Sequence, residues 1–437
     1  MTPPPAGAPS GAPVAVVGAG WAGLAAAVAL VQAGRPVTLF EMAAAPGGRA
    51  RQLPAAQGEF DNGQHILIGA YTQTLDLMRL VGADPDHLLL RQPLALRYPD
   101  GGGLQLPPGP ALPAFVRAVL AARGWRLADK LALLAAAAAW MARGFDCPEH
   151  LTVHALCNAL PVRVRDDLVD PLCVAALNTP ARSASARVFL RVLKDALFAG
   201  PGSADLLLPQ AGLSALLPEP ALRWLRAAGA GFEARHRVQH LAPGASGRAG
   251  WSVDGQRFSG VVLACSAVEA ARLVAPHQAP WAQAARQLRH EPIVTAYLAD
   301  PGLRLPQAMV ALRGQGHAPA QFVFDLARLG RHPACFAWVV SGAGDHLRLG
   351  LADCGLRVLA QARQVFPGAF LGDADQVIRH LVAERRATFA CVPGLDRPGT
   401  CVAPGLVAAG DYIAGPYPST LEGAVRSGQA AARALLA

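Results

Sequence analysis

The sequence predicts an α/β fold in which both ends of the chain build one parallel-sheet domain and an α+β domain is interleaved between them. A strand, a glycine turn, a helix and a second strand follow one another over residues 14–41. A strand, a Gly-Asp pair and a helix rich in small residues occupy 406–436. The stretch between is mostly helical at about 76–205, and strands alternate with a helix at about 285–385. At 437 residues the chain is long enough for two domains.

Composition argues against several classes of protein. The chain is 52% hydrophobic and 16% charged, yet it has no run of 18 apolar residues, so no membrane-spanning helix is predicted. The net charge of +9 comes from scattered arginines without an aromatic-interleaved basic stripe, which argues against a nucleic-acid partner. The eight cysteines form no CxxC pair, so we expect reduced thiols and no metal site.

Residues 1–12 are rich in proline and small residues and are predicted to form a flexible tail. They lack a basic segment followed by an apolar one, so no secretory signal is predicted and we expect the protein in the cytoplasm. A cationic, apolar protein is attracted to anionic lipid. Peripheral contact with the inner membrane therefore stays open.

The N-terminal pattern is a nucleotide-binding fingerprint of the Rossmann type. Val14–Val17 is a short apolar run suited to a buried parallel strand. Gly18, Gly20 and Gly23 follow as GxGxxG, in which the first glycine permits the tight turn and the second lets the backbone approach a pyrophosphate. The third allows close helix-strand packing. The helix N-terminus would face the phosphates.

Residues after the second strand refine the choice of nucleotide. The strand Val37–Phe40 leads into Glu41, 21 residues beyond Gly20, where a carboxylate accepts both ribose hydroxyls and repels a 2′-phosphate. A second glycine pair, ending in Gly48, then precedes Arg49. Glycines at this point suit the phosphate and ribityl chain of a flavin nucleotide, which pass close to the backbone, so FAD is the predicted cofactor.

The C-terminal pattern supplies the other half of the predicted site. The strand Leu406–Ala409 ends at Gly410 and Asp411, and an aspartate at a strand's carboxyl end can accept from a ribityl hydroxyl. The helix that starts at Leu421 carries small residues that let its N-terminus approach the flavin ring, where the helix dipole favours the electron-rich edge. Glu422 at this helix start is a cofactor-site candidate, and it equally fits a carboxylate that only compensates the dipole.

These motifs resemble those of the amine oxidase and phytoene desaturase superfamily, whose members carry GGR after the ribose-binding glutamate. The resemblance implies that Arg49 lies along the pyrophosphate or the flavin edge and that the Gly410-Asp411 pair contacts the ribityl chain. It also implies that the segment after residue 205 packs on the nucleotide domain. A strand there is expected to reach Val238, whose backbone would meet adenine.

The predicted domain organisation follows from these assignments. The FAD-binding domain comprises residues 13–75, 206–280 and 386–437, and the substrate domain comprises residues 76–205 and 281–385. The second domain is expected to roof the flavin with few charged residues and no metal-like spacing, which gives an apolar substrate cavity. No motif indicates a covalent link, so FAD is expected to bind non-covalently.

The middle of the chain is similar to the bacterial squalene-associated FAD enzymes, the hydroxysqualene dehydroxylases of hopanoid pathways. The segments that carry the similarity are 63–71, 171–198, 200–209 and 213–225. The resemblance implies a hydrophobic C30 isoprenoid alcohol as substrate and squalene as product, with squalene-pathway synthases as neighbours and an unidentified electron donor. Loss of the allylic hydroxyl as water would leave a delocalised cation that accepts hydride from reduced flavin.

Protonating the hydroxyl calls for a general acid, and the segment after the first nucleotide unit offers candidates. His65 can donate a proton near neutral pH, and Asp61 could orient it or hold a water. A histidine after a glycine turn is more often a hydrogen-bonded structural residue, and Asp61 also fits a structural role. Tyr417, just before the last helix, is a candidate aromatic wall of the substrate cavity, or part of the core.

Three other functions remain open from the sequence. An oxidative desaturase of carotenoids or an amine oxidase would share the flavin motifs, because a fold does not fix function. An amine oxidase would want a lysine facing the flavin, and Lys130 and Lys194 are the only lysines. A flavin-free scaffold that channels lipids between synthases is the non-enzymatic alternative.

Overall fold

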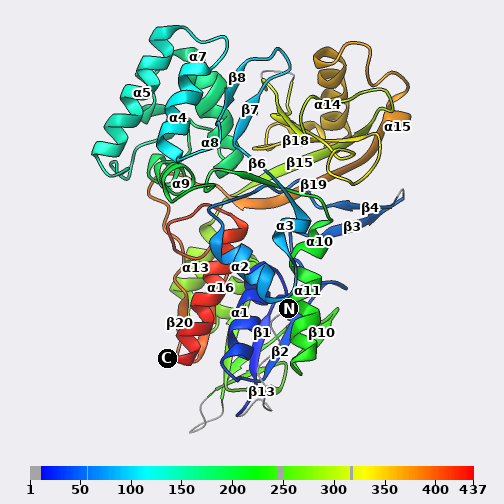
Figure 1. Cartoon of the computed structure of the whole chain (residues 1–437). Coiled ribbons are helices and arrows are strands. Elements are labelled where there is room, and N and C mark those ends of the chain that lie inside the picture. The colour runs from blue at the N-terminus through cyan, green and yellow to red at the C-terminus, as the bar shows by residue number, and fades with distance from the viewer. Residues whose placement is uncertain (1–10, 57, 245–249, 315–317) are drawn as a thin grey trace.

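The computed structural model describes residues 11–56, 58–244, 250–314 and 318–437. Residues 1–10 of the predicted tail lie outside this part of the chain. Figure 1 shows two lobes: the lower lobe is built from both chain ends, and the upper lobe holds a helical part beside a second sheet.

The sheet of the lower lobe has six strands in the order β10, β2, β1, β14, β21, β20. Neighbours are parallel except β20, which runs antiparallel to β21. The strands are β1 (Val14–Val17), β2 (Val37–Glu41), β10 (Gly231–Ala234), β14 (Gly260–Leu263), β20 (Cys401–Ala403) and β21 (Leu406–Ala408). Strands from both chain ends flank β14, so the predicted α/β class and terminal assembly are confirmed. The order reverses at β1, which places a ligand crevice at the carboxyl ends of β1 and its neighbours.

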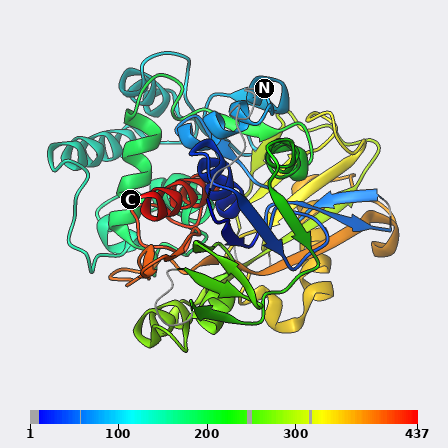
Figure 2. The same ribbon diagram turned by 90° about the horizontal axis from the view of Figure 1, so that it is seen from below.

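Two helices from opposite ends of the chain pack against each other on this sheet. They are α1 (Trp21–Gln32) and α16 (Leu421–Leu436), which lie side by side in Figure 2. A Cβ added at Gly428 of α16 would stand 2.1 Å from the Ala22 carbonyl oxygen of α1. The small residues noted in the last helix therefore set the close approach of α16 to α1, and with it the position of the α16 N-terminus.

The segment after α11 (Pro218–Ala227) differs from the prediction. β10 ends at Ala234 and does not reach Val238. Arg235 has a φ of 58°, which ends the extended conformation, and the Arg235 and His236 amides donate to the Ala43 and Glu41 carbonyl oxygens, respectively. The predicted hairpin and buried strand are present as β12 (Trp251–Val253), β13 (Gln256–Phe258) and β14, with β11 (Leu241–Pro243) beside them.

The second sheet has five antiparallel strands in the order β16, β17, β18, β15, β19. They are β15 (His290–Ala299), β16 (Met309–Ala311), β17 (Phe322–Asp325), β18 (Cys335–Val340) and β19 (Ile378–Phe389). The helix α14 (Leu351–Val365) covers one face through a separate apolar core. β19 runs past residue 385, where we placed the domain boundary, so this strand leads directly from the second sheet toward the nucleotide half.

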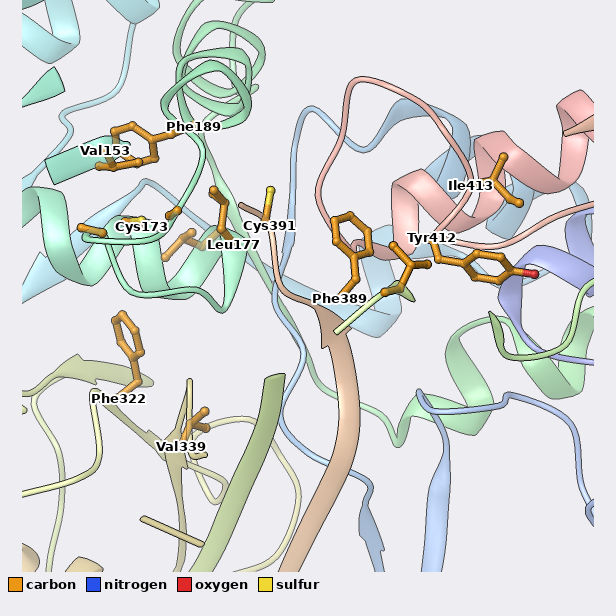
Figure 3. Packing of buried hydrophobic residues seen from close by; sticks show 14 of the residues in the cluster. Val153, Cys173, Leu177, Phe189, Phe322, Val339, Phe389, Cys391, Tyr412 and Ile413 are labelled. Carbon is orange, nitrogen blue, oxygen red and sulfur yellow. The ribbon is translucent and has the colours of Figure 1, made fainter. Parts of the chain in front are cut away.

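The helical part of the upper lobe stands beside the other face of this sheet. Its helices are α4 (Ala111–Ala121), α5 (Leu127–Ala142), α6 (Val153–Leu156), α7 (Val162–Val164), the π-helix η1 (Arg165–Val169), α8 (Asp170–Leu177) and α9 (Ala186–Phe198). One apolar core runs from these helices past the second sheet to the nucleotide half, as Figure 3 shows. The labelled side chains are Val153, Cys173, Leu177, Phe189, Phe322, Val339, Phe389, Cys391, Tyr412 and Ile413.

The remaining elements are short. They are β3 (Gln52–Ala55), β4 (Gly58–Asp61), β5 (Leu67–Ile68), α2 (Thr72–Leu80), α3 (Pro85–Leu88), β6 (Leu89–Gln92), β7 (Ala95–Arg97), β8 (Gly103–Gln105), β9 (Leu206–Pro209), α10 (Leu213–Leu216), α12 (Ala267–Val274), α13 (Ala279–Gln287), η2 (His346–Leu349) and α15 (Ala374–Val377). Within the described ranges, no helix combines the length and apolarity that a bilayer crossing requires. The same ranges hold no cluster of three or more potential metal ligands.

Candidate active site

A single cavity of about 780 Å³ reaches from the nucleotide half into the helical part of the upper lobe. Its lining includes twelve of the residues predicted for cofactor, catalysis or substrate: Gly18, Gly20, Glu41, Gly48, Arg49, His65, Val238, Gly410, Asp411, Tyr417, Leu421 and Glu422. Gly23 and Asp61 are not among the lining residues. The volume lies in the range of small-molecule and cofactor sites.

The glycine turn between β1 and α1 has the close contacts that the motif requires. Gly18 has a φ of +106°, and a Cβ there would stand 2.6 Å from the Ala264 carbonyl oxygen. A Cβ at Gly23 would stand 1.9 Å from the Gly18 carbonyl oxygen, so this glycine packs helix on strand and stays out of the cavity. Gly20 and Gly48 face each other closely enough that a Cβ on Gly48 would lie 3.2 Å from the Gly20 Cα atom. Backbone can therefore approach a diphosphate from both loops.

Glu41 lies at the carboxyl end of β2, almost fully buried. Its Oε2 atom accepts from the Ala19 amide at 2.8 Å, and its Oε1 atom accepts from the Ala43 amide at 2.8 Å. These bonds fix the carboxylate between the glycine turn and the start of the next loop. A carboxylate held there suits ribose hydroxyls.

Arg49 and Asp411 join the two ends of the chain. Arg49 Nη2 donates to Asp411 Oδ1 at 2.5 Å, and Arg49 Nη1 donates to the Ala387 carbonyl oxygen at 2.8 Å. Burial opposes ionisation of Asp411, but the Arg49 charge and hydrogen bonds outweigh it and lower the pKa of this carboxyl. Asp411 therefore stays ionised and can accept from a cofactor hydroxyl.

Val238 lies on the cavity wall although it is outside β10. Its side chain is buried, and its carbonyl oxygen accepts from Arg272 Nη2 at 2.6 Å. Arg272 thus holds this backbone in place. The contact of Val238 with adenine stays a prediction.

The N-terminus of α16 points at the same cavity, since Thr420, Leu421 and Glu422 all line it. Thr420 caps the helix through a hydrogen bond from the Gly423 amide to its Oγ1 atom. Glu422 has a second role that the sequence did not reveal: its Oε2 atom accepts from the amide and the hydroxyl of Thr74 at 2.9 and 2.7 Å. Arg426 donates to Oε1 at 2.7 Å. The carboxylate therefore ties α2 to the start of α16.

We expect Glu422→Gln to lower the thermal midpoint by several degrees, because the buried carboxylate accepts at least three hydrogen bonds and charge-assisted bonds contribute about 1.5–3 kcal/mol. Differential scanning calorimetry of the flavin-loaded protein measures this shift. Glu219→Gln is the matched control, since both partners of its 4.0 Å pair with Arg223 are largely exposed. An equal midpoint for both variants would contradict the structural role of Glu422.

Asp61 is placed differently from our expectation. Its carboxylate forms a buried ion pair with Arg331, with Oδ2 and Nη1 2.6 Å apart, and its Oδ1 atom accepts from the Leu213 amide at 2.9 Å. The Asp61 carbonyl oxygen accepts from the Tyr297 hydroxyl. These partners hold the loop before His65, so Asp61, which we predicted to orient His65 or to hold a water, is instead bound within the protein and supports this loop.

His65 lies on the cavity wall where the nucleotide half meets the upper lobe. Its Nδ1 atom is buried and has no hydrogen-bond partner among the described residues. Burial lowers the pKa of His65, and the Asp61 charge and a backbone hydrogen bond with Gly63 offset this only in part. The imidazole is therefore neutral at neutral pH, with one nitrogen free to bind a hydroxyl.

Three further buried polar groups on this wall were missed in the sequence. Both side-chain amide atoms of Gln64, the Thr295 hydroxyl and the Tyr412 hydroxyl lack hydrogen-bond partners within the described chain. Thr295 lies near His65, since a Cβ on Gly63 would stand 3.8 Å from Thr295 Oγ1 and 3.9 Å from the His65 ring. Because buried polar groups are nearly always paired, such a group of unpaired atoms indicates a ligand. The sequence could have indicated Gln64, because it directly precedes the candidate His65. Nothing in the sequence distinguishes Thr295 from any other threonine in a strand.

Beyond this polar group the cavity is apolar. β15 contributes Ile293 and Thr295 from one face, as alternation along a strand requires. Helices α4, α5, α8 and α9 supply the far end: Phe115, Leu133, Trp140, Leu172, Phe189 and Val192. Tyr417 stands on the wall beside α9, where the Arg191 guanidinium lies 5.3 Å from its ring centroid. The predicted apolar cavity is therefore present.

Comparison with known proteins fits this geometry. The model of the flavin-containing amine oxidoreductase family matches residues 21–436. The chain belongs to this family. The match shows a flavin-dependent oxidoreductase, as predicted, and the residues on the cavity wall fit that cofactor: a carboxylate at a strand end, facing glycines, the Arg49–Asp411 pair and unpaired polar atoms.

Two relatives that match over nearly their whole length indicate a narrower group within the family. The chain is 30% identical to the hydroxysqualene dehydroxylase of Sinorhizobium fredii, covering 96% of this chain and 97% of that protein. It is 29% identical to the hydroxysqualene dehydroxylase of Rhodopseudomonas palustris, covering 97% and 98%. The predicted resemblance to the squalene-associated enzymes is thus confirmed. A hydroxyneurosporene desaturase of Cereibacter sphaeroides is 44% identical over only 26% of this chain and 23% of its own length.

Solved structures confirm the fold. An oxidoreductase from Methanosarcina mazei aligns with a TM-score of 0.73 at 15% identity, over 95% of this chain and 99% of its own. Cyclohexylamine oxidase from Brevibacterium oxydans aligns with a TM-score of 0.67 at 18% identity, over 98% and 99%. Both likenesses concern the fold alone.

Proposed function

We propose that the chain binds FAD non-covalently and catalyses the reductive dehydroxylation of hydroxysqualene to squalene. The observation that carries this proposal is the cavity itself: one wall combines the flavin-binding residues, unpaired polar groups and an apolar end lined by α4, α5, α8 and α9. A molecule with one hydroxyl on a long hydrocarbon would pair those groups and fill that end. The full-length relatives named hydroxysqualene dehydroxylase support the same substrate.

The residues predicted for FAD would hold the cofactor along the nucleotide half of the cavity. Glu41 would accept from ribose hydroxyls, Gly20 and Gly48 would flank the diphosphate, and Asp411 would accept from the ribityl chain while Arg49 holds its carboxylate. The N-terminus of α16, beginning at Leu421, would direct its free amides to the ring. When bound in reduced form, the cofactor supplies hydride.

The upper part of the cavity would bind and activate the alcohol. Gln64 and Thr295 would hold the hydroxyl by hydrogen bonds, and His65 would deliver the proton with which the C–O bond breaks and water leaves. The allylic cation that remains would take hydride at carbon, so that one alcohol, one proton and one hydride give one hydrocarbon and one water. The apolar helices exclude bulk water that would otherwise capture the cation. An external reductant of unidentified nature restores the reduced flavin.

Product analysis tests the proposal. Under anaerobic conditions, the flavin-loaded protein with a chemical reductant should convert hydroxysqualene to squalene, identified by mass spectrometry. The opposite chemistry, introduction of double bonds into a carotenoid by oxidised flavin, is the alternative that the partial likeness to hydroxyneurosporene desaturase favours. Unchanged hydroxysqualene together with desaturation of neurosporene-type substrates would overturn the proposal. An amine oxidase is disfavoured because neither Lys130 nor Lys194 is among the cavity-lining residues.

The remaining expectations on partners stay predictions. A location in the cytoplasm and neighbouring squalene-pathway synthases are consistent with this function, and the proposal does not depend on either. A binding assay with purified synthases of the same organism would test the second.

A further inference from the structure

The helix α5 is apolar on two opposite faces. Leu133, Ala137 and Trp140 follow one another at helical spacing and line the cavity. Leu127 and Leu131 lie about 200° around the helix from this row, at 100° per residue. Their side chains are 66% and 54% exposed. Alanines continue the outer row at 135, 138 and 142, all exposed.

A helix that is apolar all round is normally buried, and within the described part of the chain Leu127 and Leu131 on the outer face of α5 stay exposed. The neighbouring helices also expose apolar side chains: Leu112 and Leu120 of α4 and Val162 of α7 are 42%, 48% and 60% exposed. In Figure 1 these three helices lie in the helical part of the upper lobe, above the lobe that holds the six-stranded sheet. We call Leu112, Leu120, Leu127, Leu131 and Val162 the outer leucine surface.

The segment that carries most of this surface is basic. Residues 111–143 contain five basic residues and one acidic residue: Arg117, Arg123, Arg126, Lys130, Arg143 and Asp129. The Asp129 Oδ2 atom accepts from the Arg126 amide at 2.9 Å at the start of α5. Arg163 of α7 adds no unpaired charge, because its Nε atom pairs with Asp167 at 2.7 Å. Leu112, Leu120, Leu127 and Leu131 therefore lie in a segment of net charge +4, whose basic residues we call the cationic border.

We propose that the outer leucine surface docks on an anionic lipid bilayer. Apolar side chains on helices with a basic border match the interfacial helices that insert into the headgroup region. Two copies of this chain packed through the same surface would bring the cationic borders together, which disfavours a dimer, whereas anionic lipid attracts each basic residue. The inner faces of α4 and α5 line the apolar end of the cavity, so docking here places that end next to the bilayer. Only this last point rests on the proposed function.

Vesicle co-sedimentation of the flavin-loaded full chain, without substrate, tests the proposal. We expect binding to phosphatidylcholine vesicles containing phosphatidylglycerol, and about tenfold weaker binding for Leu127→Gln/Leu131→Gln. The matched control is Leu349→Gln/Leu356→Gln, because these leucines are 68% and 51% exposed on the other side of the upper lobe. It should bind like the wild type. The flavin content of each variant reports its folding.

A second variant tests how much the basic residues contribute to vesicle binding. Arg123→Gln/Arg126→Gln should weaken binding to the anionic vesicles about fivefold per residue at low salt, and added salt should abolish the difference. Absence of vesicle binding, or equal binding by the two leucine variants, would overturn the proposal. So would a wild-type dimer, seen by sedimentation velocity, that Leu127→Gln/Leu131→Gln converts to a monomer without changing vesicle binding. Because the vesicle assay contains no substrate, its result can be interpreted even if the protein does not dehydroxylate hydroxysqualene.

Discussion

Asp411→Ala should weaken flavin binding about 10- to 100-fold, because a charge-assisted hydrogen bond contributes about 1.5–3 kcal/mol. The substitution removes the predicted acceptor for the ribityl chain. It also leaves the Arg49 guanidinium without the carboxylate 2.5 Å away, at the point where residues 362 positions apart meet. Titration of the apoprotein with FAD, followed by flavin fluorescence, measures the dissociation constant.

Asp345→Ala is the control for Asp411→Ala. Asp345 pairs with Arg348 at 2.8 Å, but its side chain is 83% exposed, so the pair contributes little. This variant should bind FAD like the wild type. Wild-type affinity in Asp411→Ala would contradict the assembly of the flavin site from both chain ends.

His65→Gln should lower kcat roughly 10²- to 10⁴-fold, the usual contribution of a general acid. Glutamine keeps a hydrogen-bonding side chain but cannot deliver a proton, so KM and flavin content should change little. Anaerobic turnover of hydroxysqualene by each protein measures the effect. His87→Gln is the control, because the His87 side chain is 85% exposed on α3.

The pH profile separates a proton donor from a merely structural histidine. Burial lowers the pKa of His65, so at neutral pH the proton-donating form is the minor one. The wild-type rate should therefore rise about tenfold for each unit by which the pH falls, until the pH reaches that lowered pKa. His65→Gln should lose this rise. A wild-type kcat in His65→Gln, or a pH-rate profile like that of the wild type, would show that His65 is not the proton donor.

The nucleotide half was predictable from the sequence because its signals are local. One strand-turn-helix-strand unit fixes the positions of Gly18, Gly20 and Glu41, and their spacing within that unit indicates a dinucleotide ligand. Gly410 and Asp411 belong to a second local pattern of the same kind. Their meeting with Arg49 followed from topology, since parallel strands place their carboxyl ends at one sheet edge.

Other roles could not be predicted because partners distant in sequence decide them. Asp61 follows a plausible active-site pattern, yet its carboxylate pairs with Arg331, which lies 270 residues later in the chain. Glu422 binds Thr74, 348 residues earlier. β10 ends before Val238 because Arg235 adopts a positive φ, which the apolar pattern does not disclose. Thr295 became a candidate only when its hydroxyl proved to be buried and unpaired on the cavity wall.

A single-turnover experiment tests the central claim, that one cavity brings a reduced flavin and an oily alcohol together. Protein whose bound flavin has been reduced is freed of excess reductant and mixed anaerobically with hydroxysqualene. We predict that the flavin is reoxidised as squalene forms, one molecule for each flavin. A flavin that stays reduced while hydroxysqualene is recovered intact would contradict the account.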